Sequence, residues 1–459
     1  MKVNASETRA FGMRDRIGYM MGDFGNDFTF ILSSSFMMKF YTDVIGIEGA
    51  VVGLVMMIAR FVDAFTDVTM GQIVDRSKPT KNGKFRPWIR RMCGPVAIAS
   101  FLIFQSGLAG MPYGFKVTWM FVTYILWGSI FYTSINIPYG SMASAISSDP
   151  GDRASLSTWR NIGATLAGLV IGTGTPLFAY VVADGKTVLS GSRMTMIAGV
   201  FSVCAVLCHL TCYYLVRERV PVPANNQKFD FMKLLKNIVT NRALLGIIAA
   251  ALLLLLSMLS LQGMAAYIFP NYYGNAKAQS TSAFLGSMSM LLVCAPLASR
   301  LASRFGKKEL AMAGCTGSVL TLIAMFIIRP ANPYTYVGLY VLTQIGYGFF
   351  NTVIWAMITD VIDDAEIKNG IREDGTIYAV YSFARKMGQA ASSGMIGFLL
   401  TLIGYTAATA YEPEILNALY NMACLIPAAG LAMVVLVLGV IYPLNKKTVR
   451  ENSQKLRVN

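Results

Sequence analysis

Charged residues, histidines and paired cysteines are scarce in this sequence. Only 14% of the 459 residues are charged and 55% are hydrophobic, a balance that excludes an ordinary soluble domain. The single histidine, His209, has no cluster of metal ligands around it in the sequence, so we interpret it as a packed polar residue on a helix. The seven cysteines lie singly in apolar stretches, without the spacing of a disulfide framework or a zinc site. They indicate small residues of a core.

Catalytic groups are also missing from the polar loops. A membrane enzyme would need a nucleophile, a metal cluster or a catalytic pair in a conspicuous loop, and these loops contain only basic and turn residues. The sequence therefore argues against an enzyme, and it predicts no cofactor. We also expect no cleavable signal, because the first residues are polar and the first apolar run has the length of a full span.

Long apolar runs, by contrast, recur along the whole chain. Runs of about 20 apolar residues are long enough to cross a bilayer as helices, and they predict an all-α membrane protein with twelve transmembrane helices. The predicted spans cover residues 17–43, 49–74, 90–109, 118–146, 156–183, 194–217, 243–268, 279–302, 310–330, 335–362, 378–405 and 417–442.

The longest polar interruption lies in the middle of the chain. Residues 217–242 predict a cytoplasmic loop between an N-terminal six-helix bundle, residues 1–216, and a C-terminal six-helix bundle with a cytoplasmic tail, residues 243–459. Basic runs follow the second and eighth predicted spans, which suggests a loose internal repeat. Such a division is expected of two bundles that move about a central site.

The positions of the basic residues along the chain explain the net charge of +15. Lysine and arginine are concentrated at the two termini and in alternate loops, and the opposite loops contain only Lys116, Lys186, Arg193, Lys277 and Arg329. This asymmetry places both termini and the basic loops in the cytoplasm. The basic character therefore reflects membrane topology, and nucleic acid is not an expected partner.

Two carboxylates lie in the middle of the second predicted span. Asp63 and Asp67 are four residues apart and share one helix face with Arg60. A charge at bilayer depth costs about 3 kcal/mol on insertion scales, so such residues usually face the protein interior and have a function there. Two acids on one face repel each other unless they share a cation or a proton, which predicts a cation or proton site.

Polar residues in other spans complete two candidate binding groups, one for a cation and one for a sugar. For a cation, oxygens are available from Asp63, Asp67, Thr66 and Thr133, and Lys386 can compete for the acids. For a sugar, hydrogen-bonding and ring-stacking groups are available from Asp27, Tyr132, Asn136, Trp159 and Arg160, and Arg385 suits a substrate carboxylate. A structural alternative stays open: Arg60 and Lys386 would hold the two halves together, and Tyr132 and Trp159 would pack or anchor helices.

Several motifs resemble those of one family of carriers. They are GDFGNDF and FYTDVIG, ARFVDAFTDVTMGQIVD followed by GKFRPW, INIPYGS, FGKK, and TDVIDDAEIKNGIREDGTIYAVYSFARKMGQA. Over its whole length the chain resembles the glycoside, pentoside and hexuronide cation symporters of the major facilitator superfamily, the group that contains the melibiose and glucuronide permeases. The resemblance implies the major facilitator fold and secondary active symport of a sugar or glycoside with a cation.

The resemblance also assigns roles to particular residues. In that family, the positions of Asp63, Asp67, Thr133 and Lys386 form the cation site. The acid matching Asp27 and the arginine matching Arg160 bind sugar.

Two departures from the melibiose permeases refine the expectation. Those sodium-using proteins have asparagine at the position of Thr66, so this chain favours a proton, with sodium as the alternative. They also have aspartate and tryptophan at the positions of Asn136 and Gly140, which argues against α-galactosides. NIPYGS and the Arg385–Lys386 pair look more like the glucuronide permease, which favours a glucuronide or hexuronide substrate.

The acidic end of the tenth predicted span predicts a gate. We expect Asp360, Asp363 and Arg372 to form ion pairs that close the cytoplasmic mouth. An alternative class is another carrier of this architecture, for a lysophospholipid or an organic anion; a lipid carrier needs an apolar side entrance, and Asp27, Asn136 and Arg160 argue against it. We expect a monomer in a bacterial cytoplasmic (inner) membrane.

Overall fold

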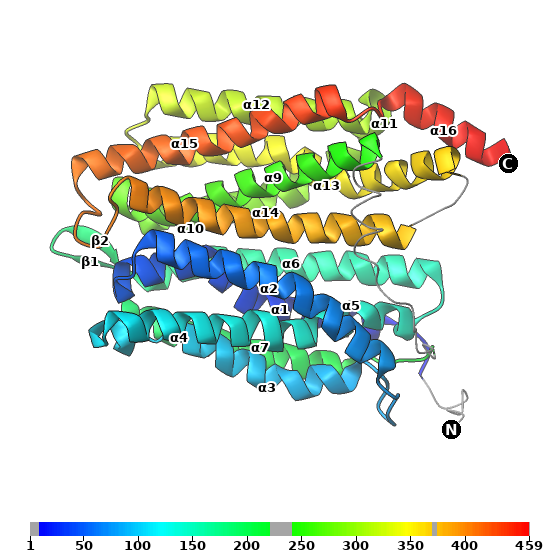
Figure 1. Cartoon of the computed structure of the whole chain (residues 1–459), viewed down its shortest axis with the longest axis horizontal. Helices are drawn as coiled ribbons and strands as arrows, with labels where there is room; N and C mark the ends of the chain where they lie inside the picture. Colours follow the sequence, from blue (N-terminus) through cyan, green and yellow to red (C-terminus); the bar gives the residue numbers. More distant parts are fainter. Residues whose placement is uncertain (1–8, 221–240, 370–373, 459) are drawn as a thin grey trace. The chain divides into compact units, whose positions relative to one another are not determined.

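The computed structural model describes residues 9–220, 241–369 and 374–458. The chain divides into two compact units, Met1–Phe229 and Asp230–Asn459 (Figure 1). Among the described residues, nine helical segments are long and apolar enough to cross a membrane. The chain is therefore a helical membrane protein.

Six long helical segments form the described part of the first unit. Two of them contain π-helical turns: η1 extends α1, and η3 joins α4 to α5 into one continuous segment. The elements are α1 (Met13–Phe40), η1 (Tyr41–Ile45), α2 (Gly49–Arg76), α3 (Arg86–Ile103), the short 3₁₀ turn η2 (Ser106–Gly110), α4 (Tyr113–Ile125), η3 (Leu126–Tyr132), α5 (Thr133–Ile146), α6 (Pro150–Ala179) and α7 (Gly191–Leu215).

Helix α1 packs closely against α6 and α7. Two glycines on α1 allow its close approach to α7. A Cβ atom on Gly22 would lie 3.0 Å from Sγ of Cys212, and one on Gly25 would lie 3.0 Å from Cε1 of His209, both on α7. Small residues of this kind let membrane helices approach each other. His209 is buried in this contact.

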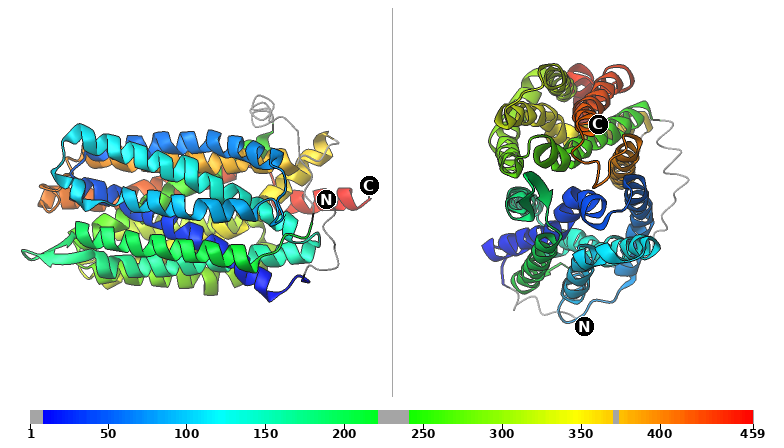
Figure 2. Two further views of the ribbon diagram at one scale, coloured as in Figure 1. Left: turned by 90° about the horizontal axis from the view of Figure 1, so that it is seen from below. Right: turned by 90° about the vertical axis from the view of Figure 1, so that its left-hand side faces the viewer.

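A short hairpin separates α6 from α7. Strands β1 (Tyr180–Ala183) and β2 (Lys186–Leu189) are antiparallel, and Tyr180 pairs with Leu189. The hairpin extends beyond the ends of the neighbouring helices (Figures 1 and 2). The fifth predicted span extends to residue 183, whereas α6 ends at Ala179. The Asp184–Gly185 pair has positive φ at both residues, as a two-residue hairpin turn requires.

Six long helical segments likewise form the described part of the second unit, followed by a terminal helix. The elements are α9 (Arg242–Tyr267), η4 (Ile268–Tyr272), α10 (Ala276–Ser289), η5 (Met290–Cys294), α11 (Ala295–Phe305), α12 (Lys307–Ile328), α13 (Pro333–Asn369), α14 (Asp374–Leu402), α15 (Pro413–Leu436), η6 (Val437–Ile441) and α16 (Lys446–Val458).

The two units repeat one pattern of helix pairing. In the first, α1 packs on α6 and α7, α3 packs on α5 and α7, and α2 packs on α5. In the second, α9 packs on α14 and α15, α12 packs on α13 and α15, and α10 packs on α13. Each helix of one unit thus has a counterpart with matching neighbours in the other. This agrees with an internal repeat of six helices.

Each of the twelve predicted spans overlaps one of the long helical segments in the described chain. Three of these segments, α1, α3 and α14, are not among the nine most apolar ones. Their sequences contain the polar groups that lower their hydropathy, such as Asp23 and Asp27 in α1 and Arg385 and Lys386 in α14.

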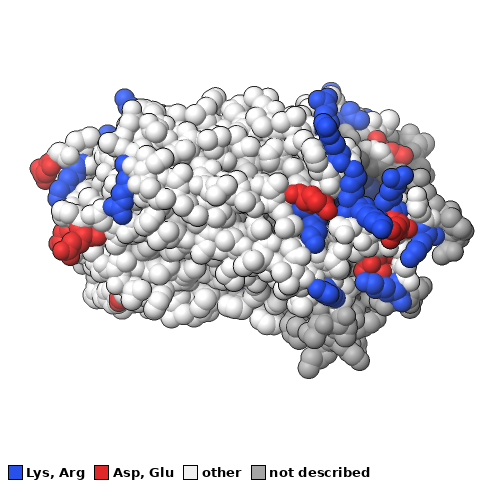
Figure 3. Space-filling model, turned by 90° about the horizontal axis from the view of Figure 1, so that it is seen from above, with Lys and Arg blue, Asp and Glu red and all other residues white. Residues whose placement is uncertain are grey.

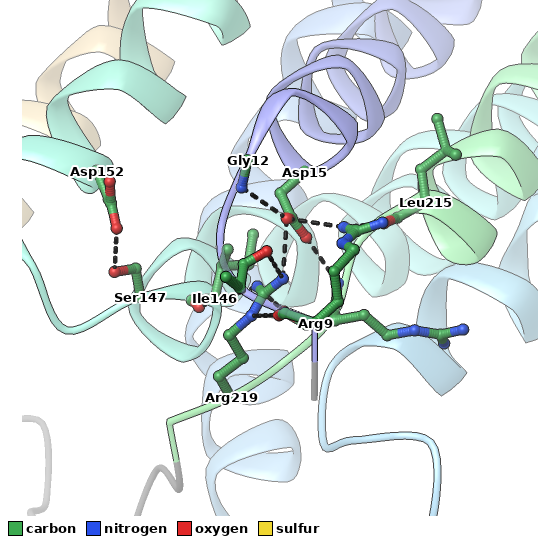
Figure 4. A network of polar contacts seen from close by, with 10 residues as sticks. Arg9, Gly12, Asp15, Ile146, Ser147, Asp152, Leu215 and Arg219 are labelled. Atoms are coloured by element: carbon green, nitrogen blue, oxygen red, sulfur yellow. Dashed lines mark hydrogen bonds and ion pairs between the residues drawn. The ribbon is translucent and has the colours of Figure 1, made fainter. Parts of the chain in front are cut away.

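Polar side chains close one end of the first unit. Asp15 at the start of α1 is fully buried and forms ion pairs with Arg9 at 2.7 Å and Arg219 at 2.9 Å (Figure 4). The backbone N–H groups of Gly12 and Arg217 also donate to its carboxylate. The chain that follows α7 is therefore tied to the beginning of α1.

Glu218 makes a second connection at this end. Its carboxylate accepts three consecutive backbone N–H groups, from Lys84, Phe85 and Arg86, at 2.7 to 2.9 Å. Lys84 and Phe85 end the loop between α2 and α3, and Arg86 is the first residue of α3, so the segment after α7 also fixes the start of α3.

Candidate functional site

The acidic pair of α2 lies inside the first unit, against η3 and α5. Asp63 is buried and Asp67 is half-buried. Arg60 Nη1 lies 3.2 Å from Asp63 Oδ2, one helical turn away. The guanidinium of Arg60 also lies over the rings of Phe30 and Tyr124, at 5.1 and 5.9 Å from their centres. Arg60 is therefore part of the packed interior and compensates the charge of Asp63.

Two hydroxyl groups on the facing segment donate to the two acids. Thr133 Oγ1 lies 2.8 Å from Asp67 Oδ1, and Ser129 Oγ lies 2.5 Å from Asp63 Oδ1. The contact of Thr133 brings together two residues of the predicted cation group. Ser129 is absent from that group, although its position four residues before Thr133 is the signal that it shares the same helix face.

The local backbone positions these hydroxyls. Ser129 belongs to the π-helical segment η3, and Thr133 is the first residue of α5. A π-helical turn inside an α-helix is rare and frequently occurs at functional sites. Pro138, further along α5, lacks the N–H that would continue the hydrogen-bond ladder.

Thr66, a member of the predicted cation group, uses its hydroxyl proton within its own helix. Its hydroxyl donates to the backbone carbonyl of Asp63 at 3.2 Å, within α2 itself. The oxygen of Thr66 keeps lone pairs that can face a ligand. Its membership of the cation group stays a prediction.

The predicted substrate group is divided among α1, η3, α5 and α6. Arg160 Nε donates to Asp23 Oδ1 at 2.9 Å, and the guanidinium lies 5.6 Å from the ring centre of Tyr139. Asp27, one turn further along α1, is half-buried and makes no hydrogen bond or ion pair with the described residues. Sequence reasoning placed Asp23 inside the first span without assigning it to the site, because spacing alone does not show which acid reaches Arg160.

The remaining members contact their neighbours through rings and amides. Asn136 Oδ1 accepts from Asn26 Nδ2 at 3.4 Å. The centre of the Tyr132 ring lies 5.8 Å from that of Phe30 and 5.5 Å from that of Trp127. Trp159 is half-buried on α6, beside Arg160 in the sequence.

In the second unit, Arg385 and Lys386 are half-buried on α14. Arg385 Nη1 donates to the Tyr381 hydroxyl at 3.2 Å, and its guanidinium lies 5.8 Å from the ring centre of Trp355. The predicted pairing of Lys386 with the acids of α2 joins two separate units and stays a prediction.

The predicted gate lies at one end of α13. Asp360 is buried and pairs with Lys307 at 2.7 Å, a partner that was not predicted. Asp363 is half-buried one turn along, and Arg372 lies outside the described residues. The neighbouring Asp364 accepts from Lys368 at 2.6 Å and from Asn452 of α16 at 3.1 Å.

Comparisons with known proteins agree with the carrier architecture. The model of the family described as MFS/sugar transport protein matches residues 18–446. The chain is 30% identical to the uncharacterized symporter YjmB of Bacillus subtilis (strain 168), covering 96% of this chain and 95% of that protein. It is 29% identical to the glucuronide carrier protein homolog of Escherichia coli (strain K12), covering 95% and 94%. It is 30% identical to the isoprimeverose transporter of Lactiplantibacillus pentosus, covering 91% and 86%.

Solved structures show the same fold at low sequence identity. The nucleoside transporter NupG matches with a TM-score of 0.64 and 14% identity, over 93% of this chain and 99% of that chain. An inward-facing bacterial homologue of the lysosomal transporter Spinster matches with a TM-score of 0.68 and 11% identity, over 96% and 97%. These neighbours and relatives are transporters and not enzymes. The chain belongs to the sugar transport proteins of the major facilitator superfamily, within the glycoside, pentoside and hexuronide symporter family.

Proposed function

We propose that this protein carries a sugar or glycoside across the membrane together with a cation, by alternating access. The observation that carries the proposal is the acidic pair of α2, in which each carboxylate accepts a hydrogen bond from a hydroxyl of the facing segment. Each carboxylate costs about 3 kcal/mol at bilayer depth. A cation that binds there compensates that cost and links ion binding to the transport cycle.

The coupling ion binds at Asp63, Asp67, Thr66 and Thr133, with Lys386 as the competing cation. A proton needs one carboxylate, whereas sodium needs several oxygens around it. Of the two acids, Asp63 already has an arginine partner and a hydroxyl donor. This supports a proton as the coupling ion, with sodium as the alternative.

The substrate is a glucuronide or a related hexuronide. Asp27, Asn136 and Arg160 offer hydrogen-bonding groups for hydroxyls, and Tyr132 and Trp159 offer ring faces. Arg385 is the partner for a substrate carboxylate, because a planar guanidinium binds two oxygens as a fork. One relative is named as a glucuronide carrier homolog, which supports an acidic sugar.

The charge distribution supports an orientation with both termini in the cytoplasm. On the face in Figure 3, formed by helices of the second unit, charged side chains gather at the two ends and leave an uncharged band between them. Lysine and arginine are densest at the end of α11 and α16, as the positive-inside rule requires of a cytoplasmic side. We place the protein in a bacterial cytoplasmic membrane, as a monomer in the lipid bilayer. Asp360, Asp363 and Arg372 then form the cytoplasmic gate.

Uptake into membrane vesicles tests the proposal. Labelled glucuronide and galactoside are supplied in separate experiments, under an imposed proton gradient or an imposed sodium gradient. We expect glucuronide accumulation driven by the proton gradient, and we expect Asp63→Cys and Asp67→Cys to abolish it. Asp184→Cys, on the exposed hairpin turn, is the control for removing an acid elsewhere. Gradient-driven accumulation by both α2 variants would show that the cation site is wrongly assigned.

A further inference from the structure

Asp63 is held by two different groups, one on each carboxylate oxygen. Arg60 Nη1 lies 3.2 Å from Oδ2, and Ser129 Oγ lies 2.5 Å from Oδ1. All three residues are buried, with exposed fractions of 5% for Asp63, 7% for Arg60 and 2% for Ser129. Each oxygen of Asp63 therefore already has one protein partner, with which a further ligand must compete.

The hydroxyl proton of Ser129 is committed to this acid. A serine hydroxyl has a single proton to donate, and the other acceptor within reach, the carbonyl of Ala59, lies at 3.5 Å. The much shorter distance to Asp63 makes the carboxylate the acceptor. Hydrogen bonds to an ionised acceptor are short and roughly twice as strong as neutral ones.

The neighbouring acid has a different setting. Asp67 is half-buried and accepts from Thr133, which lies four residues after Ser129. One hydroxyl thus contacts each acid, and Asp63 is in addition paired with an arginine of its own helix. Both oxygens of Asp63 are therefore engaged by the protein.

We propose that Ser129 is a positioning residue that sets the ion specificity of the site, by engaging one Asp63 oxygen and so disfavouring sodium as a ligand of it. The inference rests on the proposed function and adds to it. A hard cation such as sodium is bound by several oxygens, carboxylate oxygens above all. With Oδ1 engaged by Ser129, sodium that binds this oxygen must compete for it with a charge-assisted hydrogen bond.

Removing the hydroxyl should therefore favour sodium. A hydrogen bond to a charged group contributes about 1.5 kcal/mol or more, which corresponds to about tenfold in an equilibrium constant. In Ser129→Ala we expect half-maximal sodium stimulation of glucuronide uptake at about one-tenth of the wild-type sodium concentration. If the wild-type protein shows no stimulation by sodium, we expect the variant to acquire it.

The experiment measures initial glucuronide uptake into vesicles at fixed pH, over a series of sodium concentrations. Ser129→Thr keeps a hydroxyl and should restore the wild-type sodium dependence. Ser134→Ala is the matched control, because Ser134 lies on α5 and contacts α2 at Met70 Sδ, 3.6 Å away, without touching an acid. Substrate exchange without an ion gradient shows that each variant is folded, and Ser129→Cys replaces the alanine variant if that variant fails this check.

An unchanged sodium dependence in a folded Ser129→Ala or Ser129→Cys protein would overturn the inference. So would an equal shift in Ser134→Ala. Gradient-driven uptake by the wild-type protein distinguishes a failure of the proposed function from a failure of the role of Ser129. Absence of any gradient-driven uptake by the wild-type protein would refute the proposed function, whereas normal wild-type uptake with an unaltered variant refutes only the role of Ser129.

Discussion

Asp15 is the carboxylate on which the end of the first unit depends most. It is fully buried and accepts from Arg9, Arg219 and the backbone N–H groups of Gly12 and Arg217. In Asp15→Asn one oxygen becomes an NH₂ group that cannot accept, and the negative charge that pairs with two arginines is lost. Three of the four donors use Oδ2 and the Arg217 N–H uses Oδ1, so at least one donor loses its acceptor. The lost acceptor costs about 1 to 2 kcal/mol and the arginine pairs are weakened as well, so we expect a total of about 3 kcal/mol. For a unit of this size, the melting temperature should fall by about 6 to 12 °C.

A thiol-reactive dye is a suitable probe for this unfolding. Six cysteines are buried and Cys204 is half-buried in the described chain, so their thiols become reactive when the protein unfolds. Asp184→Asn is the matched control, because Asp184 is exposed, makes no ion pair within the described residues and has a positive φ that asparagine tolerates. The control should change stability by less than about 0.5 kcal/mol. A melting temperature of Asp15→Asn equal to that of the control would refute the reasoning.

Three further predictions follow from single contacts. Glu218→Gln weakens a carboxylate that binds three backbone N–H groups, so hydrogen exchange of residues 84–86 should quicken by about tenfold, measured by mass spectrometry. Arg160→Lys keeps the charge but loses the planar fork; the KM for glucuronide uptake should rise, and an unchanged KM would remove Arg160 from the substrate group. Asn452→Leu removes the hydrogen bond to Asp364, so trypsin should cleave α16 faster in the variant than in wild type.

The helices were predictable because the bilayer imposes a length on apolar segments. The second predicted span, residues 49–74, corresponds to α2 at Gly49–Arg76, and the acids appeared within it as an interruption of apolar residues. A spacing of four places Asp63 and Asp67 on one face, and Thr133 does contact Asp67. These features depend on the local period of a helix, which a single sequence contains.

Two kinds of contact were not predictable: those set by a local departure from the ideal α-helix, and those set by the packing of one helix against another. The π-helical turn η3 determines which residues of the fourth predicted span face α2, and an ideal α-helical period does not locate it. The four-residue spacing places Ser129 on the face of Thr133, but it does not show that this face turns both hydroxyls toward the acids of α2. Asp23 was missed because Asp23 and Asp27 are one turn apart on the same helix, and only the packing of α1 against α6 shows that Arg160 reaches Asp23. The Lys307–Asp360 pair likewise joins two consecutive helices at residues that are 53 positions apart in the sequence, and only the packing of α12 against α13 brings them together.

The acids of the first unit differ in how much of their acceptor capacity is used. An ionised carboxylate has about four lone-pair sites. Asp15 accepts four hydrogen bonds or ion pairs and Glu218 accepts three, both at the end of the unit, and these groups fix the structure. Asp23 has one ion pair, with Arg160, and Asp27 has neither a hydrogen bond nor an ion pair with the described residues. Spare acceptor capacity is therefore present at mid-depth in α1, where a hydroxyl-rich substrate has donors to offer, and the acids with three or four partners lie where the fold needs fixed connections.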